Sequence, residues 1–276
     1  MAINKESNVY TVIFATLMVV VVGGLLAFIS TSLKPIQEDN VRNEKKQLIL
    51  KAIGSEETKS ITREDAGAKF EEYVVERFIL DYNGNVMEGT RLTNETPVDI
   101  KNPVDAFAVD LQKEYKKFIQ PLTNKFTGDA LKEELVKETN IHYPLFICEV
   151  NDKRHFVIPV MGKGLWAGVW GYIGLEADGR TISGAVFDHK SETPGLGAEI
   201  SKDFFSDQFI EQTIVDEDGK YTAVKVVKPG TVLERPYVDG ISGGTFTSVG
   251  VDEMLVRTLE VYHKFFLNDE GKKLLQ

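Results

Sequence analysis

The N-terminal run from Val12 to Ile29 is almost wholly apolar, and no charged residue occurs between Glu6 and Lys34. About 20 such residues cross roughly 30 Å of hydrocarbon as a helix, whereas the apolar part of a cleaved signal peptide usually has about 7–15 residues. We therefore predict a retained transmembrane signal-anchor helix over residues 10–30, after a short arm of residues 1–9. The anchor confines any globular fold to the residues that follow it.

Charges around the anchor leave its orientation open. The arm carries Lys5, while the other side soon shows Lys34, Arg42 and the pair Lys45-Lys46. Counting lysine and arginine would place the large domain inside the cell, but this rule weakens for long translocated domains.

Composition narrows the class of protein. The 276 residues allow an anchor plus one domain of about 200 residues. A net charge of −10 argues against a nucleic-acid partner, because phosphate binding requires a basic face. Cys148 is the only cysteine, which excludes an internal disulfide and a cysteine-rich metal site; we expect it to be a small buried hydrophobe. The four histidines share no ligand spacing, so no metal site is expected.

Two regions follow the anchor. Residues 31–67 are predicted to be a stalk or linker with an amphipathic helix that ends at Gly54, and this helix could also dock on the domain. Residues 68–276 form the domain. Its predicted strands cover residues 73–82, 145–150, 155–161, 166–175, 181–189 and 221–227. Its predicted helices cover residues 106–119, 131–138 and 203–209, with a long one after residue 245. We predict an α+β fold, a largely antiparallel sheet with flanking helices, preceded by one transmembrane helix.

A stretch rich in glycine and hydroxyl residues, Asp239 to Ser248, lies just before that long helix. Glycine allows positive φ and close approach of a ligand to the backbone. Unpaired N–H groups and the positive end of the helix dipole make a helix start a natural phosphate site. A turn that only caps the helix remains the alternative.

Two further glycine-rich loops, residues 161–166 and 192–199, lie between predicted strands. Neither has the form of a nucleotide P-loop or a dinucleotide fingerprint. Each could be a structural turn, but the three loops together suit a planar phosphorylated cofactor. Leu165, Trp166 and Leu196 would then supply apolar cover.

A serine hydrolase is the competing class. Gly240 to Gly244 formally satisfies Gly-x-Ser-x-Gly, with Ser242 as nucleophile. That motif requires a buried strand immediately before it, whereas residues 233–239 are charged and contain a proline. The only later histidine, His263, lies deep in the predicted helix, so the context disfavours a hydrolase.

The run Ser242-Gly243-Gly244-Thr245-Phe246-Thr247 resembles the Ser/Thr-Gly-Ala-Ser/Thr-x-Thr signature of the covalent-FMN-binding domain family. In that family a flavin transferase links FMN through its phosphate to the last threonine, which is Thr247 here. The run Glu192-Thr193-Pro194-Gly195-Leu196-Gly197 is similar to a second family motif, and Gly164-Leu165-Trp166 to a third. Gly244 departs from the usual alanine, a change expected to add no clash.

Over nearly its whole length the chain resembles the C subunits of Na⁺-translocating NADH:quinone reductases. The alternative is a resemblance to the G subunits of Rnf-type electron-transport complexes, which share the flavin motif but are usually shorter. The long segment from Ser55 to Lys137 favours the quinone reductase family. The resemblance implies an electron-transfer protein with one covalent FMN per chain, while NADH and quinone bind to other members of the complex. It also implies a flavin transferase as maturation partner, a cytoplasmic arm, a single pass through the inner-membrane bilayer and a periplasmic domain at 68–276.

The resemblance, together with the three loops, assigns the residues around the cofactor. Thr247 carries the phosphoester, on a turn formed by residues 242–245 that is expected to expose it. The other cofactor-binding residues are predicted to be Ser242, Gly243, Gly244, Thr245, Glu192, Thr193, Gly195, Leu196, Gly197, Leu165 and Trp166.

Overall fold

The computed structural model describes residues 8–276, in two compact units, one ending at Lys45 and the other running from Lys46 to Gln276. Residues 1–7, which make up most of the predicted N-terminal arm, lie outside the described residues. Each unit is a separate body of the chain and is described by itself.

In the first unit the structure describes residues 8–45, which belong to helix α1 (Asn8–Lys51). Its most apolar window of 18 residues has a mean hydropathy of 2.8, and the large side chains from Val9 to Ile29 are exposed. Within residues 8–276 this is the one helix long and apolar enough to cross a membrane. The helix continues without a break past residue 31, where the stalk was predicted to begin. Pro35 lies inside the helix and does not end it.

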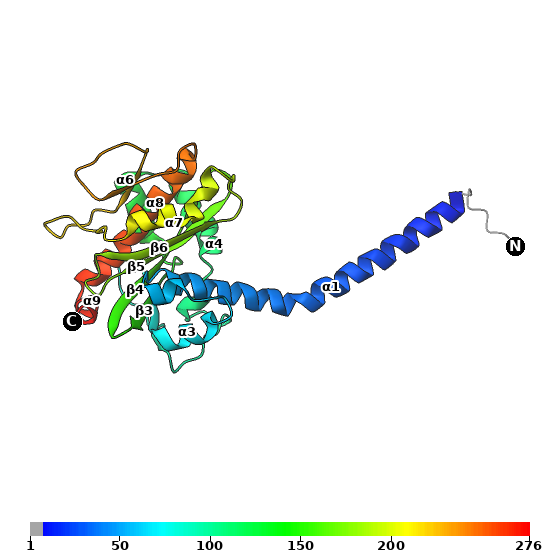
Figure 1. Cartoon of the computed structure of the whole chain (residues 1–276), viewed down its shortest axis with the longest axis horizontal. Helices are drawn as coiled ribbons and strands as arrows, with labels where there is room; N and C mark the ends of the chain where they lie inside the picture. The colour runs from blue at the N-terminus through cyan, green and yellow to red at the C-terminus, as the bar shows by residue number, and fades with distance from the viewer. Residues whose placement is uncertain (1–7) are drawn as a thin grey trace. The chain divides into compact units, whose positions relative to one another are not determined.

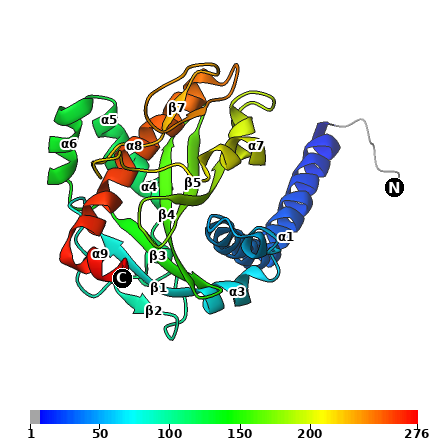
Figure 2. The ribbon, with the colours of Figure 1, turned by 60° about the vertical axis from the view of Figure 1, so that its left-hand side comes forward.

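The second unit is built on a six-stranded sheet in the order β2-β1-β3-β4-β5-β6, with every neighbouring pair antiparallel (Figures 1 and 2). The strands are β1 (Val74–Leu80), β2 (Leu92–Thr93), β3 (Tyr143–Val150), β4 (Lys153–Lys163), β5 (Gly168–Leu175) and β6 (Ile182–His189). Asn151 and Asp152 join β3 to β4 with φ of 52° and 60°, a left-handed pair typical of tight hairpins. The predicted fold class, α+β with an antiparallel sheet, is confirmed.

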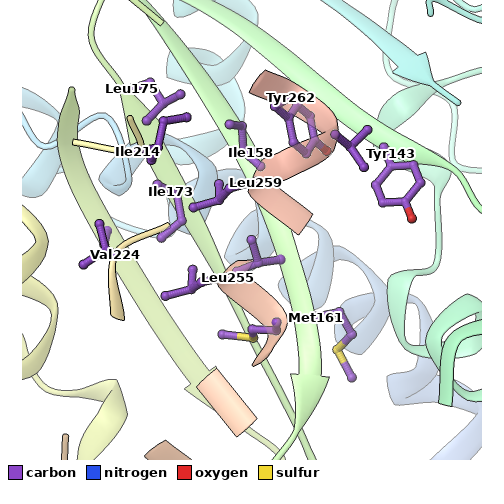
Figure 3. Packing of buried hydrophobic residues seen from close by; sticks show 14 of the residues in the cluster. Tyr143, Ile158, Met161, Ile173, Leu175, Ile214, Val224, Leu255, Leu259 and Tyr262 are labelled. Carbon is purple, nitrogen blue, oxygen red and sulfur yellow. The ribbon is translucent and has the colours of Figure 1, made fainter. Parts of the chain in front are cut away.

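Helix α8 (Thr245–Leu267) packs across one face of this sheet. Leu255, Leu259 and Tyr262 point from α8 toward the sheet, where Ile158 of β4 and Ile173 of β5 meet them (Figure 3). Alternate residues of a strand share a face, so Phe156, Ile158 and Val160 of β4 all belong to this core. The packing fixes the position of the start of α8 relative to the ends of β4 and β5.

The opposite face of the sheet is covered by the end of α1, helix α3 (Ala66–Tyr73) and the short helix η1 (Ala106–Ala108). A Cβ on Gly174 would lie 2.0 Å from the carbonyl oxygen of Ala52, so glycine there lets the segment after α1 touch the sheet. The apolar side chains of residues 46–53 are buried. This segment therefore docks on the domain and does not form a free stalk. Cys148 is fully buried on this face, and burial raises the pKa of its thiol.

Shorter elements fill the edges of the unit. They are α2 (Glu56–Lys59), α4 (Leu111–Glu114), η2 (Tyr115–Ile119), α5 (Gln120–Thr123), α6 (Gly128–Lys137), η3 (Gly197–Ser201), α7 (Asp203–Ser206), η4 (Asp207–Phe209), β7 (Lys225–Val227), β8 (Tyr237–Asp239) and α9 (Asp269–Leu274). The single helix predicted over 106–119 is wrong, because Asp105 and Asp110 each cap a separate short helix. The strand predicted over 221–227 shrinks to β7, which pairs in parallel with β8.

A buried ion pair joins β1 to the irregular segment before η1. Arg77 and Asp105 are 1% and 0% exposed, and the guanidinium donates to both carboxylate oxygens at 2.7 and 2.9 Å. Burial raises the pKa of Asp105, but hydrogen bonds from Arg77 and from two backbone N–H groups outweigh it and hold this pKa below its usual value. The carboxylate is therefore charged in the folded state and depends on its partner.

Arg77→Met should lower the free energy of unfolding by about 3–5 kcal/mol, because it leaves Asp105 buried without its cation. Denaturant unfolding of the full chain in detergent, followed by tryptophan fluorescence, measures this loss. Lys59→Met is the control: its ion pair with Asp207 is exposed, so a change of about 0–1 kcal/mol is expected. Equal effects of the two substitutions would contradict the structural role of the Arg77–Asp105 pair.

Candidate functional site

The start of α8 carries unpaired backbone donors. The N-cap residue is Gly244, and it supplies no side-chain cap. Within residues 8–276 the N–H groups of Thr245, Phe246 and Thr247 have no hydrogen-bond acceptor, and the first turn contains no acidic residue. Such a helix start attracts an anion through its free N–H groups and its dipole.

Thr247 points inward from this first turn. It is 1% exposed, and its hydroxyl donates a 2.6 Å hydrogen bond to Oε2 of Glu192. The prediction that the turn exposes Thr247 is wrong. The 3.6-residue period of α8 turns this side chain toward β4 and the loop after β6, while Phe246, one position earlier, is 71% exposed.

Glu192 ties two of the glycine-rich loops together. Its carboxylate is buried and accepts the N–H groups of Leu165 at 3.3 Å, Trp166 at 2.9 Å and Ala167 at 3.2 Å. Burial raises the pKa of Glu192, but the hydrogen bonds from Thr247 and these three N–H groups outweigh it and lower the pKa below its usual value. Glu192 is therefore a carboxylate at neutral pH.

Glycines allow the three loops to meet. A Cβ on Gly197 would lie 2.3 Å from Oγ1 of Thr247, and one on Gly164 would lie 2.6 Å from Oε1 of Glu192. Gly243 adopts φ of +76° and passes beside Leu196. A Cβ on Gly244 would come within 3.0 Å of Ile241 and 3.2 Å of the Gly197 nitrogen, so glycine avoids a tight contact that alanine would make at this position. The small residue at position 244 allows the segment at 197 to approach.

The remaining predicted residues form the rim of this site. Leu165, Trp166 and Leu196 are 46%, 67% and 41% exposed. The Trp166 indole N–H donates to the Thr193 hydroxyl at 3.2 Å, and the Gly195 N–H donates to Glu199. Ser242 and Thr245 are exposed. The structure therefore brings the residues of all three loops to one place, with apolar side chains facing solvent around a buried hydroxyl.

A cavity of about 350 Å³ opens beside Trp166 and Ala167. It lies between the end of β4, the loop after β6 and the segment 112–120. Three lysines line it, Lys116, Lys163 and Lys190, and Tyr115 adds an aromatic ring. The sequence does not predict Tyr115 or Lys116 as site residues, because nothing in the chain before residue 120 marks it as a neighbour of the glycine loops. Lys163 and Lys190 could have been found, since they lie within or next to those loops.

Hydrolase geometry is absent. The Ser242 side chain forms no hydrogen bond within the part of the chain that the structure describes, and His263 stacks against Tyr221 with ring centroids 5.6 Å apart. The strand before Ser242, β8, is a three-residue piece of a two-stranded sheet rather than a buried central strand. Across residues 8–276, no group of three or more histidine, cysteine or acidic side chains is placed to hold a metal ion.

Residues 164–260 match the family model described as FMN-binding domain, a range that contains the loops at 192–199 and 239–248 and residues 164–166 of the first loop. The C subunit of the Na⁺-translocating NADH-quinone reductase of Vibrio anguillarum is 28% identical over 272 residues, which cover 98% of this chain and 94% of that protein. The corresponding Pseudomonas aeruginosa protein is 26% identical, and the match covers 91% of both chains.

Solved structures agree with the sequence relatives. The crystal structure of the C subunit from Parabacteroides distasonis superposes with a TM-score of 0.65 at 36% identity, and the match covers 86% of this chain and 98% of that one. The NqrC protein of Shewanella oneidensis, at 23% identity and a TM-score of 0.53, shares the fold; the match covers 80% of this chain and 95% of that one. The near-complete coverage at 36% identity, the matching FMN-binding domain and the meeting of the three loops lead to one conclusion: the chain belongs to the family of C subunits of the Na⁺-translocating NADH-quinone reductase.

Proposed function

We propose that this protein is a membrane-anchored electron-transfer subunit with one FMN, bound covalently through a phosphoester to Thr247. The observation that carries the proposal is the Thr247 hydroxyl itself. It lies in the first turn of a 23-residue helix, beside three N–H groups without acceptors, and bonds to a buried carboxylate. Free backbone N–H groups beside the hydroxyl can bind phosphate oxygens, a role that a threonine needed only for packing would not require.

The residues around Thr247 fit the phosphate of a flavin. The N–H groups of residues 245–247 would hold the phosphate oxygens, and the helix dipole would stabilise the remaining negative charge by about 0.3–1 kcal/mol. Gly197, Gly243 and Gly244 keep the surrounding backbone free of side chains that would block a ligand. Residues 242–245 shape the turn that leads into the helix.

The flavin ring has matching surroundings. Leu165, Trp166 and Leu196 offer exposed apolar and aromatic surface next to the helix start. The lysine-lined cavity beside Trp166 is large enough for part of a ring system and provides positive charge in a protein of net charge −10. Bound FMN would accept and donate electrons, and these residues would shield it from water and set the electrostatic environment that tunes its potential.

The proposed partners of this chain are the other subunits of the complex to which its relatives belong. The relatives are subunits of an NADH-quinone reductase that translocates Na⁺, so we propose that this chain passes electrons between centres on other subunits. Residues 10–30 of α1 would anchor it in the inner membrane, with the arm 1–9 in the cytoplasm and the FMN domain in the periplasm, where a flavin transferase would modify it. A covalent bond suits a carrier at a membrane face, because the flavin cannot dissociate.

Thr247→Ala should abolish covalent flavin, because it removes the oxygen that forms the ester. Flavin fluorescence of the chain on a denaturing gel, from cells that contain the flavin transferase, measures this directly. Thr245→Ala is the matched control: its side chain is exposed and lies two positions away, on another face of α8, so fluorescence should persist. Equal fluorescence of the Thr247→Ala and wild-type chains would exclude the assignment.

Val232→Cys should be labelled by a membrane-impermeant maleimide in right-side-out membrane vesicles, because Val232 is 82% exposed in the domain proposed to be periplasmic. The native Cys148 is fully buried and its thiol pKa is raised, so the wild-type chain should remain unlabelled. Asn8→Cys, at the other end of the anchor, should react only in inverted vesicles. The reverse pattern would place the domain in the cytoplasm.

A further inference from the structure

Formation of an ester at Thr247 must release the hydroxyl proton, and the structure shows which group accepts a hydrogen bond from that hydroxyl. Thr247 Oγ1 donates to Glu192 Oε2 at 2.6 Å, and within residues 8–276 its hydroxyl has no other hydrogen-bond partner. The neighbouring hydroxyls differ: Ser248 donates to the Gly244 carbonyl, and Ser242 and Thr245 are exposed without a carboxylate partner. Among the four hydroxyls at this helix start, one alone contacts a base.

We propose that Glu192 is the proton acceptor for the modification of Thr247 and thereby selects this hydroxyl, an inference that rests on the proposed covalent attachment. The donor must be a flavin nucleotide with a pyrophosphate, of which FAD is the simplest. Thr247 Oγ1 forms a bond to the phosphorus of the FMN half, the bond from that phosphorus to the bridging oxygen breaks, AMP leaves, and the Oγ1 proton passes to Glu192. No atom changes oxidation state.

The charges of the site favour this transfer. Before the reaction Glu192 is an anion that accepts four hydrogen bonds, one of them from the Thr247 hydroxyl. The product places a phosphodiester anion at the same point. If Glu192 remained ionised, its carboxylate and the phosphodiester would place two negative charges side by side in a buried site. A protonated Glu192 leaves only the charge of the phosphodiester and can donate a hydrogen bond to the new ester.

The position of Glu192 is held independently of Thr247. The N–H groups of Trp166 and Ala167 bind Oε1, the oxygen that does not contact the hydroxyl, and the Leu165 N–H adds a longer bond to Oε2. A Cβ on Gly197 would lie 2.3 Å from Oγ1, so glycine at this position keeps a side chain away from the hydroxyl. The three N–H groups hold the carboxylate beside it.

The experiment uses the full chain, purified in detergent from cells without a flavin transferase, then mixed with purified transferase and FAD. Intact mass followed over time gives the rate of flavin addition, and peptide mapping gives the modified residue. Glu192→Gln should slow the addition by about 10²–10⁴-fold, the range of a general base. Glu199→Gln, the same change in the same loop, should keep the wild-type rate, because an amide oxygen can still accept the Gly195 N–H.

Glu192→Ala supplies the second arm, since it removes the base and leaves space for a small carboxylate. Formate should restore part of its rate in proportion to concentration, and chloride should not; a purely structural role of Glu192 would not respond to formate. Thermal unfolding of each variant establishes that it is folded. Modification of Glu192→Gln at the wild-type rate, or a folded Glu192→Ala without formate rescue, would overturn this inference alone. A wild-type chain that takes up no flavin at Thr247 would instead overturn the proposed function.

Discussion

The hydrogen bond from Thr247 to Glu192 is the interaction around which the functional end of this domain is arranged. It joins the first turn of α8 to the loop after β6, and Glu192 in turn gathers the backbone of the loop after β4. A buried carboxylate is stable only when donors satisfy it, so all these segments must be in place together. One buried charge thereby fixes the relative positions of three loops that are far apart in the chain.

The sheet and α8 make that arrangement possible. The core between β4, β5 and α8 sets where the helix begins (Figure 3). Glycines let backbones come closer than side chains would allow. Gly250 is one position where close approach requires glycine, because a Cβ there would lie 2.0 Å from the Lys163 carbonyl oxygen at the end of β4. Glycine near this helix start thus serves packing as well as ligand access.

Much of the fold could be predicted from local patterns. Alternating residues and tight turns located β3 to β6, and the spacing of apolar residues located α8, because both patterns are set by the backbone period of a single element. The prediction of one helix over 106–119 failed for a physical reason. Side-chain caps at Asp105 and Asp110 start two separate short helices, and the spacing of apolar residues does not reveal such caps. Residues 46–53 were ambiguous because docking depends on glycines in distant strands.

Composition, periodicity and motif are local properties. They were enough to predict one strongly apolar segment, an antiparallel α+β domain and three glycine-rich loops that resemble a flavin-attachment family. Long-range contacts were needed to show that Thr247 is buried rather than exposed, that its hydroxyl donates to Glu192 and that Lys116 lies near Trp166. Those facts depend on contacts between residues that are distant in the chain, and no local pattern encodes which distant side chain will meet a given hydroxyl.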